Sequence, residues 1–224
     1  MNGILYLVGT PIGNLQDITL RALTILKEVD LVIAEDTRSA KRLLSHFEIN
    51  KPVRRYDDYA GVGVYEKIKK ELMDGAKIAL VTDAGMPIIA DPGAKLISYL
   101  KKESPKIKIE VIPGPTALTT ALTGLGFNAS HFTFIGYPPH QKGRVKFFSQ
   151  LKDVEARPVV LYESPYRFQK TLTALLEVFG SNQEIGVARE MTKIYEEYWR
   201  GTIEEAKEYF VSEKLKGEFV LIIS

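Results

Sequence analysis

Short apolar runs alternate with segments of helical periodicity through the first half of the chain. Four runs have the length and composition of buried parallel strands: residues 3–9, 31–34, 78–81 and 107–112. Apolar side chains recur every three or four residues in the intervening segments, near residues 20–26, 39–47, 65–73 and 94–102. Strands that alternate with helices through short connections predict a mostly parallel sheet with helices on its faces.

The pattern changes after residues 113–115, where two prolines flank a glycine. A small, alanine-rich helix is predicted at residues 116–123, and later helical segments end near residues 179 and 210. Strands are predicted at residues 132–136, 159–162, 185–191, 194–200 and 219–223. Two of these strands follow one another without a helix, as in an antiparallel or mixed sheet. We therefore predict an α/β protein of two domains, residues 1–114 with a mostly parallel sheet and residues 115–224 with a mixed sheet.

Composition narrows the class of protein. The 224 residues are 45% hydrophobic and 26% charged, which is ordinary for a globular protein, and no apolar run approaches the roughly 18 residues of a membrane span. The chain has no cysteine, so disulfides and thiolate chemistry are excluded, and a reducing, cytoplasmic location is expected. The net charge of +2 means that any nucleic-acid contact would rest on local clusters of Lys and Arg. The three histidines are scattered, and no metal site is predicted.

Polar and small residues follow the predicted strands of the first half. These strand-end loops lie at residues 10–14, 35–38, 82–93 and 113–117. The carboxyl ends of parallel strands meet at one edge of a sheet, so the loops are expected to lie together there. Phosphate-loop, zinc-protease and nucleophile-elbow motifs are absent. What remains suits a cofactor that is polar at its ribose and flat at its base, such as an adenosyl group.

Specific residues can be assigned to such an adenosyl site. The candidates are Asp83 as acceptor of a ribose hydroxyl, Ile12, Met86 and Ile88 as apolar walls, and Thr116 and Ala117 as a close backbone approach. A second interpretation is a tight turn in which Asp83 caps the next helix, because Asp, Gly and Pro are ordinary turn residues. The residues of this stretch alone leave both interpretations open.

Six blocks of sequence, in chain order, carry a family resemblance. They are TPIGNL at 10–15, AEDTR at 34–38, TDAGMP with DPG at 82–87 and 91–93, PGP at 113–115, YES with Arg at 162–164 and 167, and ARE with TK at 188–190 and 192–193. Together they resemble the ribosomal RNA small subunit methyltransferase I family of the tetrapyrrole methylase superfamily. The resemblance extends over nearly the whole chain.

The resemblance implies a function. It implies S-adenosylmethionine-dependent 2′-O-methylation of a cytidine in the decoding region of bacterial 16S ribosomal RNA, in the small ribosomal subunit. It also implies a tetrapyrrole-methylase-like fold of two α/β domains with the cofactor in a cleft between them, as a homodimer. Carried over to this chain, it adds Pro11, Gly85, Tyr162 and Ala188 to the cofactor-binding candidates.

Methyl transfer to a ribose hydroxyl needs aligned donor and acceptor and a group that helps to remove the proton. Glu35 and Asp36 follow a predicted strand beside Arg38. We expect Asp36 to orient or deprotonate the hydroxyl while Arg38 binds an RNA phosphate. The alternative is a structural ion pair between Asp36 and Arg38 that caps the following helix.

Several basic side chains could contact RNA phosphates, and Lys142, Arg144 and Arg167 among them lie in loops that follow predicted strands of the second half. The candidates are Lys41, Arg42, Lys142, Arg144, Arg167, Arg189 and Lys193, and Tyr137 and Tyr166 are available to stack on exposed bases. For each basic residue alone, a solvated surface charge is the alternative. Two other functions remain open: a methyltransferase acting on a corrin or porphyrin precursor, and a non-catalytic nucleotide-binding or assembly protein.

Overall fold

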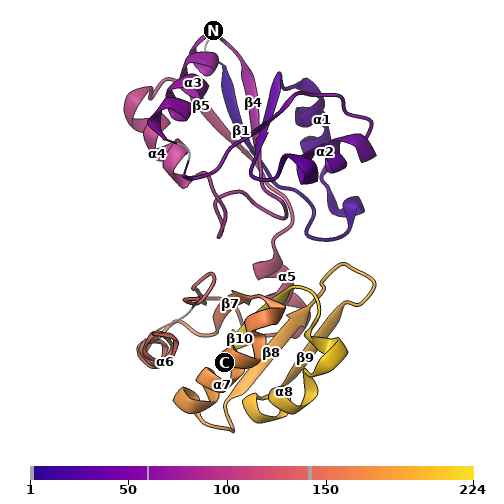
Figure 1. Ribbon diagram of the computed structural model, residues 1–224, viewed down its shortest axis with the longest axis vertical. Coiled ribbons are helices and arrows are strands. Elements are labelled where there is room, and N and C mark those ends of the chain that lie inside the picture. Colours follow the sequence, from indigo (N-terminus) through magenta and orange to yellow (C-terminus); the bar gives the residue numbers. More distant parts are fainter. Residues whose placement is uncertain (1–2, 60, 141–142) are drawn as a thin grey trace. The chain divides into compact units, whose positions relative to one another are not determined.

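The structure, a computed structural model, describes residues 3–59, 61–140 and 143–224. The chain forms two compact units, Met1–Thr116 (unit 1) and Ala117–Ser224 (unit 2), each with its own sheet (Figure 1). The sequence places the boundary at Gly114, within the same connection. Each unit is described by itself below.

Unit 1 is built on a parallel sheet, as the sequence predicts. Its strands are β1 (Ile4–Val8), β2 (Leu31–Ala34), β3 (Val53–Arg55), β4 (Lys77–Val81) and β5 (Lys108–Ile112). They lie in the order β3-β2-β4-β1-β5, and every neighbouring pair is parallel. The apolar pattern misses β3, because this short edge strand contains two arginines and only one apolar residue.

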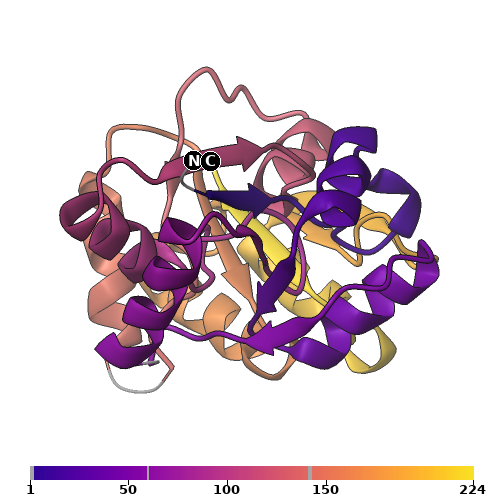
Figure 2. The same cartoon turned by 90° about the horizontal axis from the view of Figure 1, so that it is seen from above.

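Four α-helices cover the two faces of this sheet (Figures 1 and 2). They are α1 (Leu20–Glu28), α2 (Thr37–His46), α3 (Val62–Met73) and α4 (Ala94–Glu103), and a 3-10 turn at Leu15–Asp17 precedes α1. Side chains of β4 alternate between two core clusters: Ala79 and Val81 pack with α1 and α2, whereas Ile78 and Leu80 pack with α3 and α4. Both faces are therefore buried, which explains the continuous apolar runs.

The connections of unit 1 define where a ligand would bind. The chain leaves β1 for α1 on one face of the sheet and leaves β4 for α4 on the other face, although β1 and β4 are neighbours. In open parallel sheets, ligands bind outside the carboxyl ends of the strands at such a switch point. The loops that follow β1 and β4 are therefore the place to look for the site.

Unit 2 contains a mixed sheet, again as predicted. Its strands are β6 (Thr133–Phe134), β7 (Val159–Glu163), β8 (Glu184–Arg189), β9 (Glu197–Thr202) and β10 (Phe219–Ile223). They lie in the order β6-β7-β10-β8-β9, with β6 and β7 parallel and the other pairs antiparallel. The hairpin predicted from two successive strands is β8 and β9.

The helices of unit 2 lie on both faces of its sheet. They are α5 (Ala117–Leu125), α6 (Arg144–Ser149), α7 (Pro165–Phe179) and α8 (Ile203–Tyr209), with 3-10 helices at Gln150–Asp153 and Ser212–Leu215. α6, α7 and α8 pack on one face around a phenylalanine-rich core. On the other face α5 approaches closely: a Cβ atom at Gly124 would lie 2.2 Å from the Tyr198 ring. No helix is predicted from the sequence at α6, because its six residues are too few to show a helical period.

Candidate functional site

The loops after β1 and β4 meet at the carboxyl edge of the unit 1 sheet. The Thr10 amide donates to the Gly85 carbonyl at 2.9 Å, and the Gly85 amide donates back to the Thr10 carbonyl at 3.1 Å. The buried Thr10 hydroxyl also donates to the Thr82 carbonyl at 3.2 Å. Segments more than 70 residues apart in sequence are therefore fixed together, as expected for strand ends in a parallel sheet.

The loop after β5 joins this edge, because Gly9 and Gly114 have no side chains to keep the two loops apart. A Cβ atom at Gly9 would lie 2.7 Å from the Cα atom of Gly114 and 2.7 Å from the sulfur of Met86. The loops after β1 and β5 thus pack backbone against backbone, and Met86 lies over Gly9. The sequence assigns the close backbone approach to Thr116 and Ala117, but the structure also places one at Gly9 and Gly114, before them in the chain.

Predicted apolar walls lie beside this junction or below it. Ile12 is buried, and its Cγ2 atom lies 3.4 Å from the position that a Cβ atom would take at Gly85. Pro11, which precedes it, is also buried. Ile88 instead packs against the core cluster that contains Leu80. Ile12 and Met86 therefore line the strand ends, whereas Ile88 anchors its loop to the core.

The loop between β4 and α4 has a strained backbone. Four of its residues have positive φ angles: Gly85 (81°), Ile88 (79°), Ala90 (64°) and Gly93 (134°). A positive φ is rare for a β-branched residue such as isoleucine, and such strain persists where the surrounding structure enforces it, often at ligand sites. One end of the loop is held by Thr10, and at the other end the Gly93 amide donates to the Asp58 carboxylate at 3.0 Å.

Carboxyl groups from two strand ends and from this loop influence one another at the edge. Burial raises the pKa of Asp91 from 3.8 to about 6; the charges of Glu35 and Asp83 add to this rise, and the Thr82 hydroxyl offsets part of it. Burial, followed by the charge of Asp83, also raises the pKa of Glu35. The pKa of Asp83 is raised by burial and by the charge of Asp36. The edge therefore concentrates negative charge and suits a ligand that brings hydroxyl donors or positive charge.

Asp36 and Arg38 form the ion pair that the sequence offers as an alternative to catalysis. Asp36 caps α2, since its Oδ1 accepts from the Arg38 amide at 2.8 Å. The Arg38 guanidinium donates to both carboxylate oxygens, at 3.1 and 2.9 Å. These hydrogen bonds hold the pKa of Asp36 at about 2. The Arg38 side chain is 86% exposed and therefore open to solvent.

The cofactor candidates of unit 2 lie together on the face that α5 covers. The Tyr162 hydroxyl accepts from the Leu118 amide at 3.2 Å, next to Ala117 in the first turn of α5. Tyr162 and Ala188 pair with opposite sides of the same residue of β10, Val220, so both side chains lie on one face of the sheet. The structure thus brings Ala117, Tyr162 and Ala188 into one region of unit 2.

The predicted RNA contacts fall into two groups. Lys41 and Arg42 are exposed on α2, and Lys41 also lines an open hollow at the end of this helix. The other described candidates make ion pairs inside unit 2: Arg144 and Arg167 with Glu163, Arg189 with Glu197, and Lys193 with Glu190 and Glu218. Lys142 lies outside the described residues.

Two carboxylates of these sites have no role assigned from the sequence. Asp91 belongs to the Asp-Pro-Gly block, and Glu163 ends the apolar run of β7 with Arg167 four residues later. A carboxylate that ends a buried strand is itself a signal, because burial of its charge requires partners.

In the described part of the chain, no cluster of His, Cys, Asp and Glu is arranged to hold a metal ion. No helix formed by the described residues has the length and apolar character to cross a membrane.

Comparisons with known proteins place this chain in a family. The model of the tetrapyrrole (corrin/porphyrin) methylases matches residues 4–207. Ribosomal RNA small subunit methyltransferase I of Thermotoga maritima is 43% identical, covering 99% of this chain and 98% of that protein. The protein of the same name from Halalkalibacterium halodurans is 44% identical, covering 99% of this chain and 75% of that protein.

Solved structures show the same fold at much lower identity. The uroporphyrin-III C-methyltransferase of Thermus thermophilus superimposes with a TM-score of 0.69 at 20% identity, covering 99% of this chain and 94% of that one. At this identity the likeness concerns the fold alone. The family match and the full-length relatives show that the chain belongs to the tetrapyrrole methylases and, among them, to the ribosomal RNA small subunit methyltransferase I family.

Proposed function

We propose that this chain transfers a methyl group from S-adenosylmethionine to the ribose 2′-hydroxyl of a cytidine in the decoding region of 16S ribosomal RNA. The observation that carries the proposal is the match, at 43% and 44% identity over 99% of the chain, to relatives named as small-subunit ribosomal RNA methyltransferases. The cytidine and the 2′-hydroxyl come from the family resemblance of the sequence. They are the parts that need direct measurement.

The residues at the edge of unit 1 fit this donor. S-adenosylmethionine carries a positive sulfonium, an ammonium group and ribose hydroxyls, and it supplies a methyl group that is already activated. Asp83 and Asp91 provide carboxylate acceptors, and Ile12 and Met86 provide apolar contact. In unit 2, Ala117, Tyr162 and Ala188 remain predicted donor contacts.

Residues of α2 are the proposed contacts for the acceptor. A carboxyl group whose pKa is about 2 is a weak base at neutral pH, so Asp36 is better suited to orient the hydroxyl than to remove its proton. Arg38 presents an exposed guanidinium, and Lys41 and Arg42 follow on the same helix. These cations suit the phosphates on either side of the reacting nucleotide. Glu35 completes the set of candidate catalytic residues.

The activity is tested by incubating the protein with labelled S-adenosylmethionine and three acceptors: unmodified small ribosomal subunits, free 16S RNA, and a tetrapyrrole precursor. We expect label in the RNA, at one cytidine whose 3′ phosphodiester resists alkali because its 2′-oxygen is methylated. Label in the tetrapyrrole alone would support the corrin or porphyrin alternative. Donor binding without transfer to any acceptor would support a non-catalytic role.

A matched pair of variants tests the donor site separately. Asp83→Asn removes the proposed hydroxyl acceptor, so the dissociation constant for S-adenosylmethionine should rise by about tenfold or more. Asp74→Asn changes an exposed aspartate after α3 and should leave the constant unchanged. Equal affinities for the two variants would remove Asp83 from the site. We further propose a cytoplasmic homodimer, and light scattering during gel filtration would measure its mass.

A further inference from the structure

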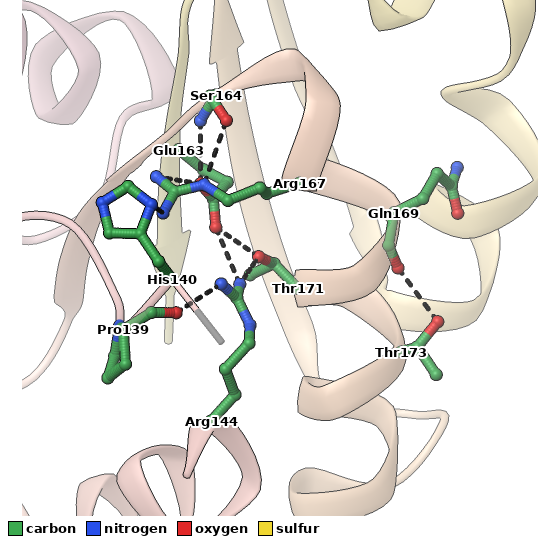
Figure 3. A network of polar contacts seen from close by, with 9 residues as sticks. All are labelled: Pro139, His140, Arg144, Glu163, Ser164, Arg167, Gln169, Thr171 and Thr173. Carbon is green, nitrogen blue, oxygen red and sulfur yellow. Dashed lines mark hydrogen bonds and ion pairs between the residues drawn. The ribbon is translucent and has the colours of Figure 1, made fainter. Parts of the chain in front are cut away.

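Residues 136–140, a segment that follows β6, are held by a buried ion-pair network (Figure 3). This segment contains Tyr137, two prolines and His140. Beneath it, the Glu163 side chain has no exposed surface at all. A carboxylate buried to this extent is stable only when its oxygens are fully hydrogen-bonded.

Four groups form hydrogen bonds or ion pairs with the Glu163 carboxylate. Arg144 Nη2 lies 2.8 Å from its Oε2, and Arg167 Nη2 lies 2.8 Å from its Oε1. The Ser164 amide donates to Oε1 at 2.8 Å, and the Thr171 hydroxyl donates to Oε2. Two guanidinium groups thus share one carboxylate, which leaves the network with a net positive charge. Their side chains are only 11% and 15% exposed.

Each arginine also directs its Nη1 atom to the segment above it. Arg144 Nη1 donates to the Pro139 carbonyl at 2.8 Å. Arg167 Nη1 lies 2.9 Å from His140 Nδ1, and its guanidinium lies 5.8 Å from the centre of the Tyr137 ring. Since an arginine is always a donor, His140 accepts through Nδ1 and keeps its proton on Nε2. The shape of residues 137–140 is therefore set from below by Glu163.

The two rings of this segment remain accessible. Tyr137 is 53% exposed, and His140 is also exposed. The Tyr137 ring also forms a T-shaped contact with the Tyr162 ring, with ring centres 5.6 Å apart. Tyr162 is one of the predicted donor contacts, so the segment lies beside that region of unit 2.

We propose that Tyr137 and His140 form a stacking surface for an unpaired base of the substrate RNA, and that Glu163 is the residue that positions it through Arg144 and Arg167. Unpaired bases stack on the flat faces of tyrosine and histidine rings. The two arginines then support the surface instead of contacting phosphates, which revises the role expected from the sequence. The proposal rests on the function proposed above.

The first test measures the affinity of the full chain for a 16S RNA transcript. Tyr137→Ala should raise the dissociation constant about tenfold, while Tyr137→Phe, which keeps the ring, should stay within about twofold of the wild type. Tyr195→Ala removes another exposed tyrosine of unit 2 and serves as the control, with no expected change. Affinity for S-adenosylmethionine should not change in any of them. Wild-type RNA affinity in Tyr137→Ala would overturn the proposal.

The second test asks whether Glu163 acts through this surface. Glu163→Gln should weaken RNA binding about tenfold in the wild-type background but by less than about twofold when Tyr137 and His140 are already alanine. Far-UV circular dichroism gives the folded fraction by which each affinity is corrected. An equal loss in both backgrounds would mean a general structural effect and would contradict the positioning role.

The salt dependence of RNA binding shows whether Arg167 supports the stacking surface or contacts a phosphate directly. Arg167→Ala should weaken RNA binding without changing the slope of log affinity against log salt. A direct phosphate contact would instead lower the slope by about one. That result would return Arg167 to the role expected from the sequence. If the wild-type chain itself neither binds nor methylates RNA, the proposed function fails; if it does both while Tyr137→Ala is normal, only the stacking surface fails.

Discussion

Replacing Asp91 with asparagine should stabilise unit 1 at neutral pH while weakening donor binding. Burial and the neighbouring carboxylates raise the pKa of Asp91 from 3.8 to about 6. A raised carboxyl pKa means that the folded state binds the proton more tightly than the unfolded state. Its contribution to stability is therefore fully present below pH 3.8 and is lost as the pH rises through about 6.

The size of the effect follows from this interval. At 1.36 kcal/mol per pH unit, a rise from 3.8 to about 6 corresponds to about 3 kcal/mol. Asp91 is partly exposed, and solvent screening reduces this to roughly 1–2 kcal/mol. Asparagine has the same shape without the charge, so Asp91→Asn should unfold at higher urea than the wild type at pH 8. At pH 4 the two should be nearly equal.

The assay is urea unfolding of both proteins from pH 4 to pH 8, followed by far-UV circular dichroism. Trp199 is the single tryptophan and lies in unit 2, so its fluorescence follows the unfolding of that unit. Asp74→Asn is the matched control in unit 1. A difference between Asp91→Asn and wild type that does not grow between pH 4 and pH 7 would refute the reasoning.

Two further predictions concern packing and charge in unit 1. Gly9→Ala should lower the free energy of unfolding by roughly 2–3 kcal/mol and abolish donor binding, because its Cβ atom would lie 2.7 Å from the backbone of Gly114. The control, Gly63→Ala, lies in open space on α3 and should raise the free energy of unfolding by about 0.5–1 kcal/mol in the same urea titration. Arg54→Ala should cost roughly 1 kcal/mol at pH 7, because it removes bonds of 2.9 and 2.6 Å to Glu71. Arg54 lowers the pKa of Glu71 from its ordinary 4.5, so this cost should be fully present above pH 4.5 and should fade as the pH falls below it. A cost that stays constant with pH would contradict this prediction.

The sequence predicts those parts of the fold in which burial leaves a continuous pattern. Residues 31–34 and 219–223 are strands with the predicted ends, because apolar side chains fill both of their faces. β3 carries no such pattern: it lies at an edge, and its Arg54 finds Glu71 on a helix that follows later in the chain. The sequence around residues 53–55 contains no signal that predicts the ion pair between Arg54 and Glu71.

The candidate site also has parts that the sequence predicts and parts that it does not. The gathering of strand-end loops follows from parallel topology, so the proximity of Thr10 to Gly85 could be anticipated. The pairing of Asp36 with Arg38 is local and was among the alternatives. The partnership of Glu163 with two arginines depends on where α6 and α7 pack, which spacing in the sequence does not reveal. Charge patterns therefore identified the basic residues but not what they bind.

The position of β10 has a consequence for how the protein is made. β10 lies at the centre of the unit 2 sheet, between β7 and β8, and all five of its residues are buried. It is nevertheless translated after every other element of that unit. During synthesis β6 and β7 are therefore separated from β8 and β9, and the two pairs of strands join into one sheet only after β10 has left the ribosomal tunnel.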